Sequence, residues 1–312
     1  MARHSVLTIT LNASVDTYYR LEALTIGAIT RTANPVRTAG GKGLNVARVL
    51  KQLGIDVTAT GFVGGRNGDF IRAELRKAGI KDEFIEIEGE TRQCLAFMDR
   101  LKNQTEILEE GPLISEEEQF LFKKEVGPLL ERSEVVSISG SLPKGTSPEM
   151  YQWIIEEARK RGKRVLLDTS GKALVHCLPY APFLVKPNME ELEKLIGREC
   201  ARDEDVWAAM EQIAENGIQV VIVSNGGKGS FVLHNGERLK VSPPKIEAVS
   251  SVGSGDAFVA GFAAGLIYGK SIGECVALAT ACGTANALEE KTGCIQPELV
   301  DGLLEKVNVE HV

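Results

Sequence analysis

The sequence of 312 residues has few of the features that mark secreted, membrane-spanning or metal-cluster proteins. Its six cysteines are widely spaced and form no C-x-x-C pair, so we expect free thiols. No stretch reaches the roughly 18 apolar residues that a membrane span needs, and no basic segment followed by an apolar run opens the chain. We therefore expect a cytoplasmic protein that does not bind membranes.

Positive charge is also scarce. Lysine and arginine number 36 against 43 aspartates and glutamates, and the formal net charge is -7. A general nucleic-acid binder normally carries a basic domain or stripe, so we expect no nucleic-acid partner. An anionic small molecule remains compatible, because a few local cations can line a pocket on an acidic protein. The four histidines are isolated and H-E-x-x-H does not occur, so the sequence gives no support for zinc-protease chemistry.

Apolar residues make up 43% of the chain, enough for a sizeable core, and their spacing alternates between that of strands and that of helices. Such alternation predicts an α/β fold with a mostly parallel sheet covered on both faces, in a single domain spanning 1–312. The expected strands are 5–11, 57–63, 135–139, 164–168, 220–224 and a hairpin over 230–241, and the expected helices are 43–53, 69–78, 115–131, 148–161, 188–196, 203–215, 254–268 and 272–288.

One region breaks this alternation. Three short strands are expected at 83–88, 93–99 and 105–109 with no helix between them. Together with the polar-apolar segment 16–37 they suggest a small sheet that stands apart from the main one. We expect the segments of about 12–38 and 83–110 to form a lid.

Glycines gather where strands end and helices begin, which is where open α/β sheets bind ligands. Gly40-Gly41-Lys42-Gly43 leads into a helix, and the Lys42 cation with the Asn45 amide suits a phosphorylated polyhydroxy ligand. A tight turn alone would also use such glycines. The segments 139–145 and 224–229 follow strands as well. Because 224–229 precedes another strand, it fails the dinucleotide fingerprint, which opens a helix.

The segment Gly253-Ser254-Gly255-Asp256 opens a helix rich in small residues. Unpaired N–H groups and the positive end of the helix dipole would face an anion there. Asp256 in the first turn could simply complement the dipole, but that role needs no flanking glycines. A carboxylate beside an anion site suits a base that accepts a hydroxyl proton while backbone donors hold developing phosphoryl charge.

With G-G-K-G-L-N at 40–45 and V-G-S-G-D-A-F at 252–258, the chain resembles the ribokinase-like (PfkB) carbohydrate kinases over essentially its whole length. The resemblance implies a three-layer α/β/α fold with a small β-sheet lid, ATP and Mg²⁺ as cofactors, and a small phosphorylated sugar as substrate. Within the family the chain is most similar to kinases of tagatose 6-phosphate and of fructose 1-phosphate. We expect tagatose 6-phosphate as substrate, with fructose 1-phosphate as the alternative, and a homodimer formed through the lid.

The resemblance also assigns roles to individual residues. Asp256 would be the base, and Arg92 would approach the substrate phosphate, as a planar guanidinium suits. Ala13 departs from the family's usual proline beside Asp16, which leaves the sugar specificity open. The remaining assignments are Gly253, Ser254 and Gly255 to the anion hole, Asp16, Gly40, Gly41, Lys42, Asn45 and Ser139 to the sugar, Lys186, Asn188, Ser224, Gly226, Gly227 and Gly229 to the nucleotide, and Asn188 with Glu191 to Mg²⁺ through water.

Two other classes of function compete with a kinase. A catalytically idle sensor of sugar phosphate or nucleotide could share the fold, although it would have no need of Asp256. A dinucleotide oxidoreductase is disfavoured because its fingerprint is missing after the first strand.

Overall fold

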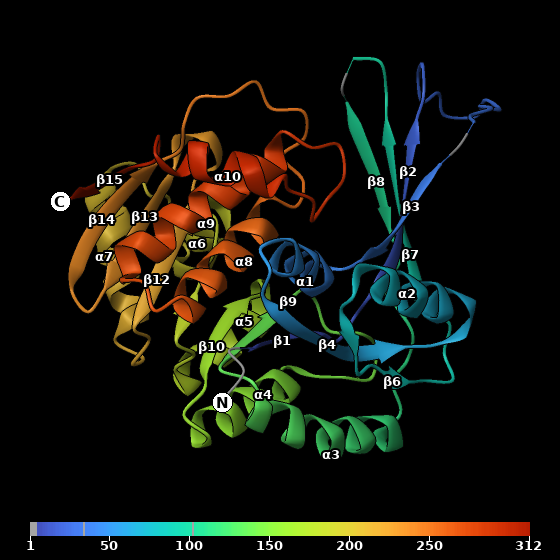
Figure 1. Ribbon diagram of the computed structural model, residues 1–312, viewed down its shortest axis with the longest axis horizontal. Helices are drawn as coiled ribbons and strands as arrows, with labels where there is room; N and C mark the ends of the chain where they lie inside the picture. The colour runs from blue at the N-terminus through green and yellow to red at the C-terminus, as the bar shows by residue number, and fades with distance from the viewer. Residues whose placement is uncertain (1–4, 34, 102) are drawn as a thin grey trace.

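The computed structural model describes residues 5–33, 35–101 and 103–312 and arranges them around two β-sheets (Figure 1). The larger sheet has the strand order β15-β14-β13-β12-β11-β10-β9-β1-β4-β5, with β6 also paired to β4. Strands from β12 to β5 run parallel, whereas β13, β14 and β15 add an antiparallel edge. The strands are β1 (Ser5–Thr10), β4 (Asp56–Val63), β5 (Lys81–Asp82), β6 (Ile85–Glu86), β9 (Val135–Ser139), β10 (Arg164–Asp168), β11 (Leu184–Val185), β12 (Val220–Ser224), β13 (Ser230–His234), β14 (Glu237–Ser242) and β15 (Asn308–His311).

Helices cover both faces of this sheet, as a buried parallel sheet requires. Successive strand residues point to opposite faces, so Val6 joins one apolar core and Leu7 the other. One face carries α1 (Lys42–Gln52), α2 (Gly65–Ala78), α8 (Ser254–Ile267), α9 (Ile272–Ala287) and α10 (Pro297–Leu304), and the other carries α3 (Glu116–Arg132), α4 (Pro148–Lys160), α5 (Gly171–Cys177), α6 (Met189–Ile196) and α7 (Asp203–Ala214). The three-layer α/β/α prediction is confirmed.

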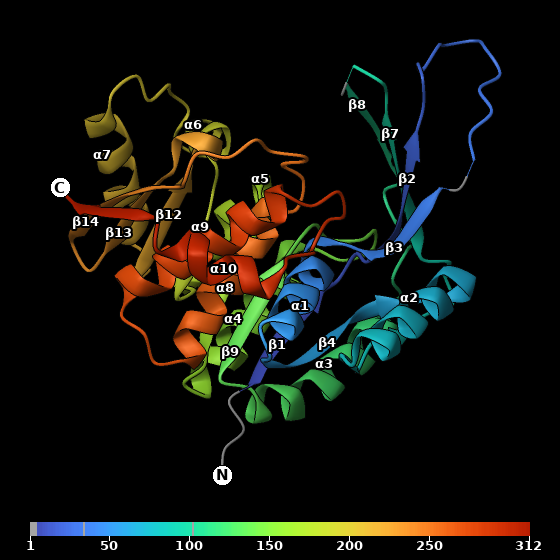
Figure 2. The same cartoon turned by 45° about the horizontal axis from the view of Figure 1, so that its top comes forward.

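The smaller sheet projects from this body in both overall views (Figures 1 and 2). Its strands are β2 (Ser14–Arg20), β3 (Val36–Gly40), β7 (Arg92–Met98) and β8 (Gln104–Leu108), in the order β3-β2-β7-β8. Strand β8 is exposed along its whole length, and Tyr19 and Phe97 stack on neighbouring strands with ring centroids 5.1 Å apart. The predicted separate sheet is therefore present.

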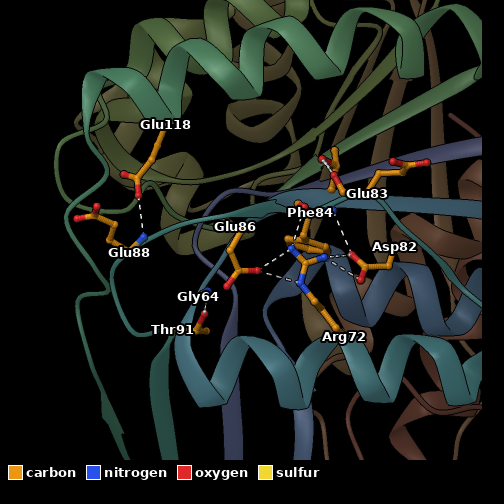
Figure 3. A network of polar contacts seen from close by, with 10 residues as sticks. Gly64, Arg72, Asp82, Glu83, Phe84, Glu86, Glu88, Thr91 and Glu118 are labelled. Carbon is orange, nitrogen blue, oxygen red and sulfur yellow. Dashed lines mark hydrogen bonds and ion pairs between the residues drawn. The ribbon is translucent and has the colours of Figure 1, made fainter.

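The strand expected at 83–88 lies elsewhere, and its assignment to the small sheet was wrong. The chain after α2 forms β5 at 81–82 and β6 at 85–86, and both strands pair with β4 at the edge of the main sheet. Figure 3 shows the reason: Arg72 of α2 binds the Asp82 carboxylate, the Phe84 carbonyl and the Glu86 carboxylate. Five hydrogen bonds from one guanidinium hold the segment against the body, so the small sheet takes only 92–108 from this part of the chain.

Several short elements were not anticipated. Helices α5 and α10 and strands β11 and β15 fell in segments that the pattern left unassigned. The hairpin of β13 and β14 and the long helices α8 and α9 were predicted. All six cysteines are free thiols. In the part of the chain that the structure describes, no helix has the length and apolar character to cross a membrane.

Candidate active site

The sequence-predicted glycine segments meet at one edge of the main sheet. Strands β1, β9, β10, β11 and β12 are neighbours in the sheet, and their carboxyl ends open toward the helix starts of α1, α6 and α8. Ligands of open α/β sheets bind at this edge. The arrangement therefore places the four glycine segments around a common site.

Helix α8 begins at Gly253, whose φ of 83° lies in the left-handed region that favours glycine. Thr292 also crowds this position, because a Cβ on Gly253 would come to 3.1 Å from the Thr292 Cβ. Ser254 and Gly255 form the first helical residues, and their N–H groups belong to those that no helical carbonyl satisfies. This start of α8 is thus suited to bind an anion.

Asp256 lies in the first turn of α8 and is only 6% exposed. The Asn45 side chain donates a hydrogen bond from Nδ2 to Asp256 Oδ2 at 2.6 Å. Burial and the charge of Asp168 raise the pKa of Asp256 to about 6, although Lys42 and the Asn45 amide favour the ionised form. A carboxylate with this pKa is ionised at neutral pH and can still accept a proton, which suits a general base.

Asp168 is a charged residue of the site that the sequence reasoning missed. It ends β10, is 3% exposed, and lies between two lysines, with Lys42 Nζ at 3.6 Å and Lys186 Nζ at 3.5 Å from its Oδ1. Burial opposes its ionisation, but Lys186 and Lys42 outweigh that effect and hold its pKa below the usual range. The feature of the sequence that could have indicated Asp168 is an aspartate at the end of a predicted strand.

Asp16 lies on the other side of the site, at the start of the small sheet. Its Oδ1 accepts a hydrogen bond from the Ser14 hydroxyl at 2.6 Å, and burial raises its pKa despite the charges of Arg48 and Arg92. The carboxylate packs directly on Gly40, where an added Cβ would come within 2.1 Å of Asp16 Cγ. Gly41 follows as the residue before α1, and Asn45 is in the second turn of that helix. Asp16 and the Gly40-Gly41 turn are therefore in direct contact.

A cavity of about 480 Å³ opens beside this turn, and Arg92 and Asn12 line it with Ser141, Lys144 and other residues of the 140–146 loop. The Arg92 guanidinium donates to the carbonyl oxygens of Asn12 and Glu109. A second cavity, of about 790 Å³, shares Arg92 and Lys144 with the first. Arg92 and Lys144 thus border both cavities, where the small sheet joins the main body.

Two sequence assignments near this cavity need correction. Ser139 is fully buried in β9 and its hydroxyl pairs with Ser137 at 3.1 Å, so it is not placed to touch a ligand. Ser141, two residues further on, lines the cavity instead. The side chain of Lys42 reaches Asp168 at the centre of the site, while Lys144 is the lysine beside Arg92. The period-two alternation of β9 points Ser139 into the core.

The predicted nucleotide-side residues also come together. Lys186 is buried after β11, and its Nζ would be 3.4 Å from a Cβ on Gly255 at the anion-binding start of α8. Asn188 pairs with Ser224 across the sheet edge, which brings the 224–229 segment alongside. This segment forms a single 3-10 turn, with Gly226, Gly227 and Lys228 in the turn and Gly229 closing it.

Asn188 and Glu191 start α6 as a capping box. Glu191 N–H donates to Asn188 Oδ1 at 2.8 Å, and Asn188 N–H donates to Glu191 Oε2 at 2.9 Å. Glu191 is also close enough to Lys42 to help raise the pKa of that lysine, after Asp168 and Asp256. The side-chain oxygen atoms of Asn188 and Glu191 are hard ligands of the kind that Mg²⁺ takes, with water and substrate phosphate completing its coordination shell. The residues present therefore fit a magnesium ion held through water.

An anion-binding helix start, a buried carboxylate beside it, and a cavity that Arg92 and Lys144 line under a projecting sheet are typical of a kinase of small phosphorylated molecules. The sequence model that describes the pfkB family carbohydrate kinases matches residues 9–299 of this chain, and the chain belongs to this family. It is therefore an ATP-dependent sugar kinase, and the prediction from the two glycine motifs is confirmed.

Individual members of the family show which kinases the chain is similar to. The chain is 40% identical over 310 residues to the tagatose-6-phosphate kinase of Staphylococcus epidermidis, covering 98% of this chain and 100% of that protein. Phosphofructokinase-2 of Escherichia coli, in complex with fructose-6-phosphate, is 29% identical with a TM-score of 0.89, covering 98% and 99%. A Thermotoga maritima protein described as a possible 1-phosphofructokinase is 29% identical with a TM-score of 0.91, covering 99% and 100%.

Proposed function

We propose that the protein transfers the γ-phosphoryl group of ATP to the C1 hydroxyl of tagatose 6-phosphate, forming tagatose 1,6-bisphosphate. The observation that carries the chemistry is the position of Asp256, a buried carboxylate one residue beyond the anion-binding glycines of α8. The choice of sugar is supported by the full-length similarity to a tagatose-6-phosphate kinase.

Asp256 acts as the base in this proposal. Its carboxylate takes the proton of the sugar hydroxyl as the hydroxyl oxygen bonds to the γ-phosphorus. The bond between that phosphorus and the β,γ-bridging oxygen breaks, and ADP leaves with the electron pair. The N–H groups of Gly253, Ser254 and Gly255 stabilise the negative charge on the transferring group, because they are fixed and aimed before the reaction starts. Lys42 and Lys186 add positive charge beside Asp168.

The phosphate already on the sugar occupies the cavity beside Arg92. Arg92, Lys144 and Ser141 supply two cations and a hydroxyl there, and Asn12 fixes the loop by donating from Nδ2 to Ser141 Oγ at 3.1 Å. Lys144 binds Glu110 at 2.5 Å in the structure, so it exchanges this exposed carboxylate for the substrate phosphate. Asp16 holds the sugar hydroxyls in this proposal, which is supported by the packing of its carboxylate on the turn at Gly40.

The nucleotide phosphates lie between α8 and the 186–191 and 224–229 segments. Lys186 faces them, and Ser224, Gly226, Gly227 and Gly229 border the nucleotide. Mg²⁺, held through water by Asn188 and Glu191, would neutralise the phosphate charge as the bridging oxygen departs.

An assay with three substrates tests the proposal. The purified protein is given ATP, Mg²⁺ and tagatose 6-phosphate, fructose 1-phosphate or fructose 6-phosphate, and ADP release is measured. We expect kcat/KM for tagatose 6-phosphate to exceed the other two by at least about tenfold. A preference for fructose 1-phosphate would establish the alternative specificity, and no turnover of any sugar would indicate a sensor.

The small sheet is proposed to be a lid and a dimer contact. Ile107 and Leu108 on β8 are 56% and 59% exposed, an apolar pair on an unpaired edge strand. A second copy of the sheet would cover this edge, which otherwise offers free N–H and C=O groups. The reducing cytoplasm expected from the cysteines fits the free thiols.

A further inference from the structure

Arg48 is a charged residue at the centre of the molecule to which the mechanism above gives no role. It lies on α1, one turn beyond Asn45, and its partly buried guanidinium is directed at three protein acceptors. Nη2 donates to the side-chain oxygen Oδ1 of Asn45, and also to the carbonyl oxygen of Thr292 at 3.0 Å. Nη1 donates to the carbonyl oxygen of Ala39. An ion pair at the protein surface would not need one guanidinium to be held by three protein acceptors.

The contact with Asn45 determines which way its amide points. A guanidinium can only donate hydrogen bonds, and an ionised carboxylate can only accept them. Asn45 lies between the two, with Arg48 on its oxygen and Asp256 on its nitrogen. Rotating the amide by half a turn would set an oxygen against the carboxylate and an NH₂ group against the guanidinium. Arg48 therefore excludes the orientation that would repel the proposed base.

The two backbone contacts tie this amide to both halves of the site. Ala39 directly precedes the Gly40-Gly41 turn that packs on Asp16. Thr292 packs against Gly253, so its carbonyl lies on the loop that supports the start of α8. One guanidinium therefore joins the sugar-side turn, the amide and the anion-binding helix start.

Charges from several elements surround this group. Burial lowers the pKa of Arg48, while Asp16, Asp256, Cys294 and Glu74 act in the opposite direction. Asp256 is faced by Asp168 from β10, by Lys42 from α1 and by Lys186 after β11. Arg48 therefore acts on Asp256 by two routes, its charge and the Asn45 amide, and a lysine at position 48 would keep the first while losing the second.

We propose that Arg48 is a positioning residue, which orients the Asn45 amide so that its N–H donates to the carboxylate of Asp256 and keeps that base in place and ionised. The inference rests on the proposed role of Asp256. It adds to that role a relay of three side chains, Arg48 to Asn45 to Asp256, along one face of α1.

The test compares Arg48→Lys and Arg48→Met with the native protein in the kinase assay. A lysine keeps the charge but cannot reach three acceptors at once. We expect kcat to fall roughly ten- to a hundredfold, and the acid limb of the kcat–pH profile to move up by about half a pH unit or more, because a donor to the ionised form is lost. In a third variant, Arg48→Ala, which leaves space for the ion, added guanidinium should restore part of the activity and return the acid limb toward its native position.

Gln52 provides a matched control on the same helix. It donates to the Gly293 carbonyl at 3.2 Å and accepts from Ile295 N–H at 2.7 Å, so it binds the same loop without touching Asn45. Gln52→Leu should lower the melting temperature while leaving the acid limb where it is. If the Arg48 variants behave like Gln52→Leu, Arg48 is a structural residue and the inference is overturned.

A double-mutant cycle separates this inference from the proposed function. In an Asn45→Ala background, Arg48→Lys should move the acid limb no further, because the amide that relays the effect is gone. A full additional shift would contradict the relay. If Asp256→Asn itself keeps near-native kcat, the base assignment fails. If Asp256→Asn is inactive and Arg48→Lys leaves the profile unchanged, only the inference fails.

Discussion

At the scale of single residues, the site contains two neighbouring aspartates whose pKa values are moved in opposite directions. Asp168 is held ionised by Lys42 and Lys186, whereas burial and that same ionised Asp168 raise the pKa of Asp256 to about 6. A pair of carboxyl groups separated in this way is typical of sites that divide electrostatic and proton-transfer roles. Asp168 therefore anchors the lysines, and Asp256 remains able to take a proton.

The first prediction concerns pH. Because Asp256 must be ionised to act as a base, kcat should fall as the pH drops through about 6 and approach a plateau above it. The measurement is kcat at saturating sugar phosphate and ATP, from about pH 5 to about pH 9. Phosphate monoesters also titrate near pH 6, so the profile is repeated with a second sugar phosphate. A kcat that stays level across the acid range would contradict the assignment.

Arg92 carries the second prediction. Replacing it with alanine removes the guanidinium that borders the cavity, so KM for the sugar phosphate should rise by more than about tenfold, while KM for ATP changes little. Arg100 serves as the control, since it lies beyond β7 on an exposed loop and pairs only weakly with Glu22 at 3.7 Å. Arg100→Ala should leave both constants unchanged. Equal losses for both substrates in Arg92→Ala would indicate misfolding or a nucleotide role.

At the scale of elements, the small sheet is attached to the body at a narrow base. Thr91, directly before β7, accepts a hydrogen bond from Gly64 N–H at 2.9 Å, and Glu90 accepts from Asn67 N–H at 2.6 Å (the Thr91 contact is drawn in Figure 3). These contacts hold the chain at the start of α2. Beyond them β7 continues half-buried and β8 is exposed throughout. A sheet held mainly at this end, with the exposed Arg20–Glu290 ion pair as a further contact at the outer end of β2, is suited to close over a ligand.

The third prediction follows from this attachment. In hydrogen exchange, the amides of β8 and of the outer ends of β2 and β7 should gain protection when sugar phosphate and a non-hydrolysable ATP analogue are added together. Closure would exclude water, which competes with the sugar hydroxyl for the γ-phosphoryl group. Helices α1 and α8 should change much less. Equal protection of the sheet with and without ligands would show that it is a fixed part of the domain.

At the scale of the whole molecule, the layers and the location of the site could be predicted because they follow from repeating patterns. Strand and helix spacing gave β1, β4, β9, β10 and β12 with the helices that cover them, and glycines at their ends indicated the ligand edge. The small sheet was found through the break in this repeat. The place of 83–88 was missed because its alternation is the same in either sheet. Its pairing with β4 depends on contacts that the alternation does not encode: Arg72 binds Asp82 and the Phe84 carbonyl, and the Thr60 hydroxyl donates to the Glu83 carbonyl.

Site residues were predictable where a motif carried them and were missed where only tertiary contacts define them. Asp256, Asn45 and Lys186 lie in glycine or K-P-N segments that stand out in the sequence. Asp168 and Arg48 lie in ordinary strand and helix patterns, and their importance comes from partners far along the chain. Ser139 was confused with Ser141 because both fall in one loop motif, but β9 ends at Ser139 and only Ser141 lies in the loop that lines the cavity.

The central claim is that Asp256 is the base of an ATP-dependent sugar-phosphate kinase, and the most direct test is Asp256→Asn. The variant keeps the shape of the side chain, so kcat with tagatose 6-phosphate should fall by roughly 10²–10⁴-fold. The folded-state pKa is raised above its ordinary value, so this carboxyl costs stability as the pH rises through about 6. The neutral variant should therefore be as stable as the native protein at pH 8 or more so, by at most about 3 kcal/mol.

The measurement pairs kcat with thermal unfolding of the same samples. A large loss of kcat at an equal or higher melting temperature is the result that the account predicts. A variant that turns over ATP and tagatose 6-phosphate at nearly the native rate would contradict it.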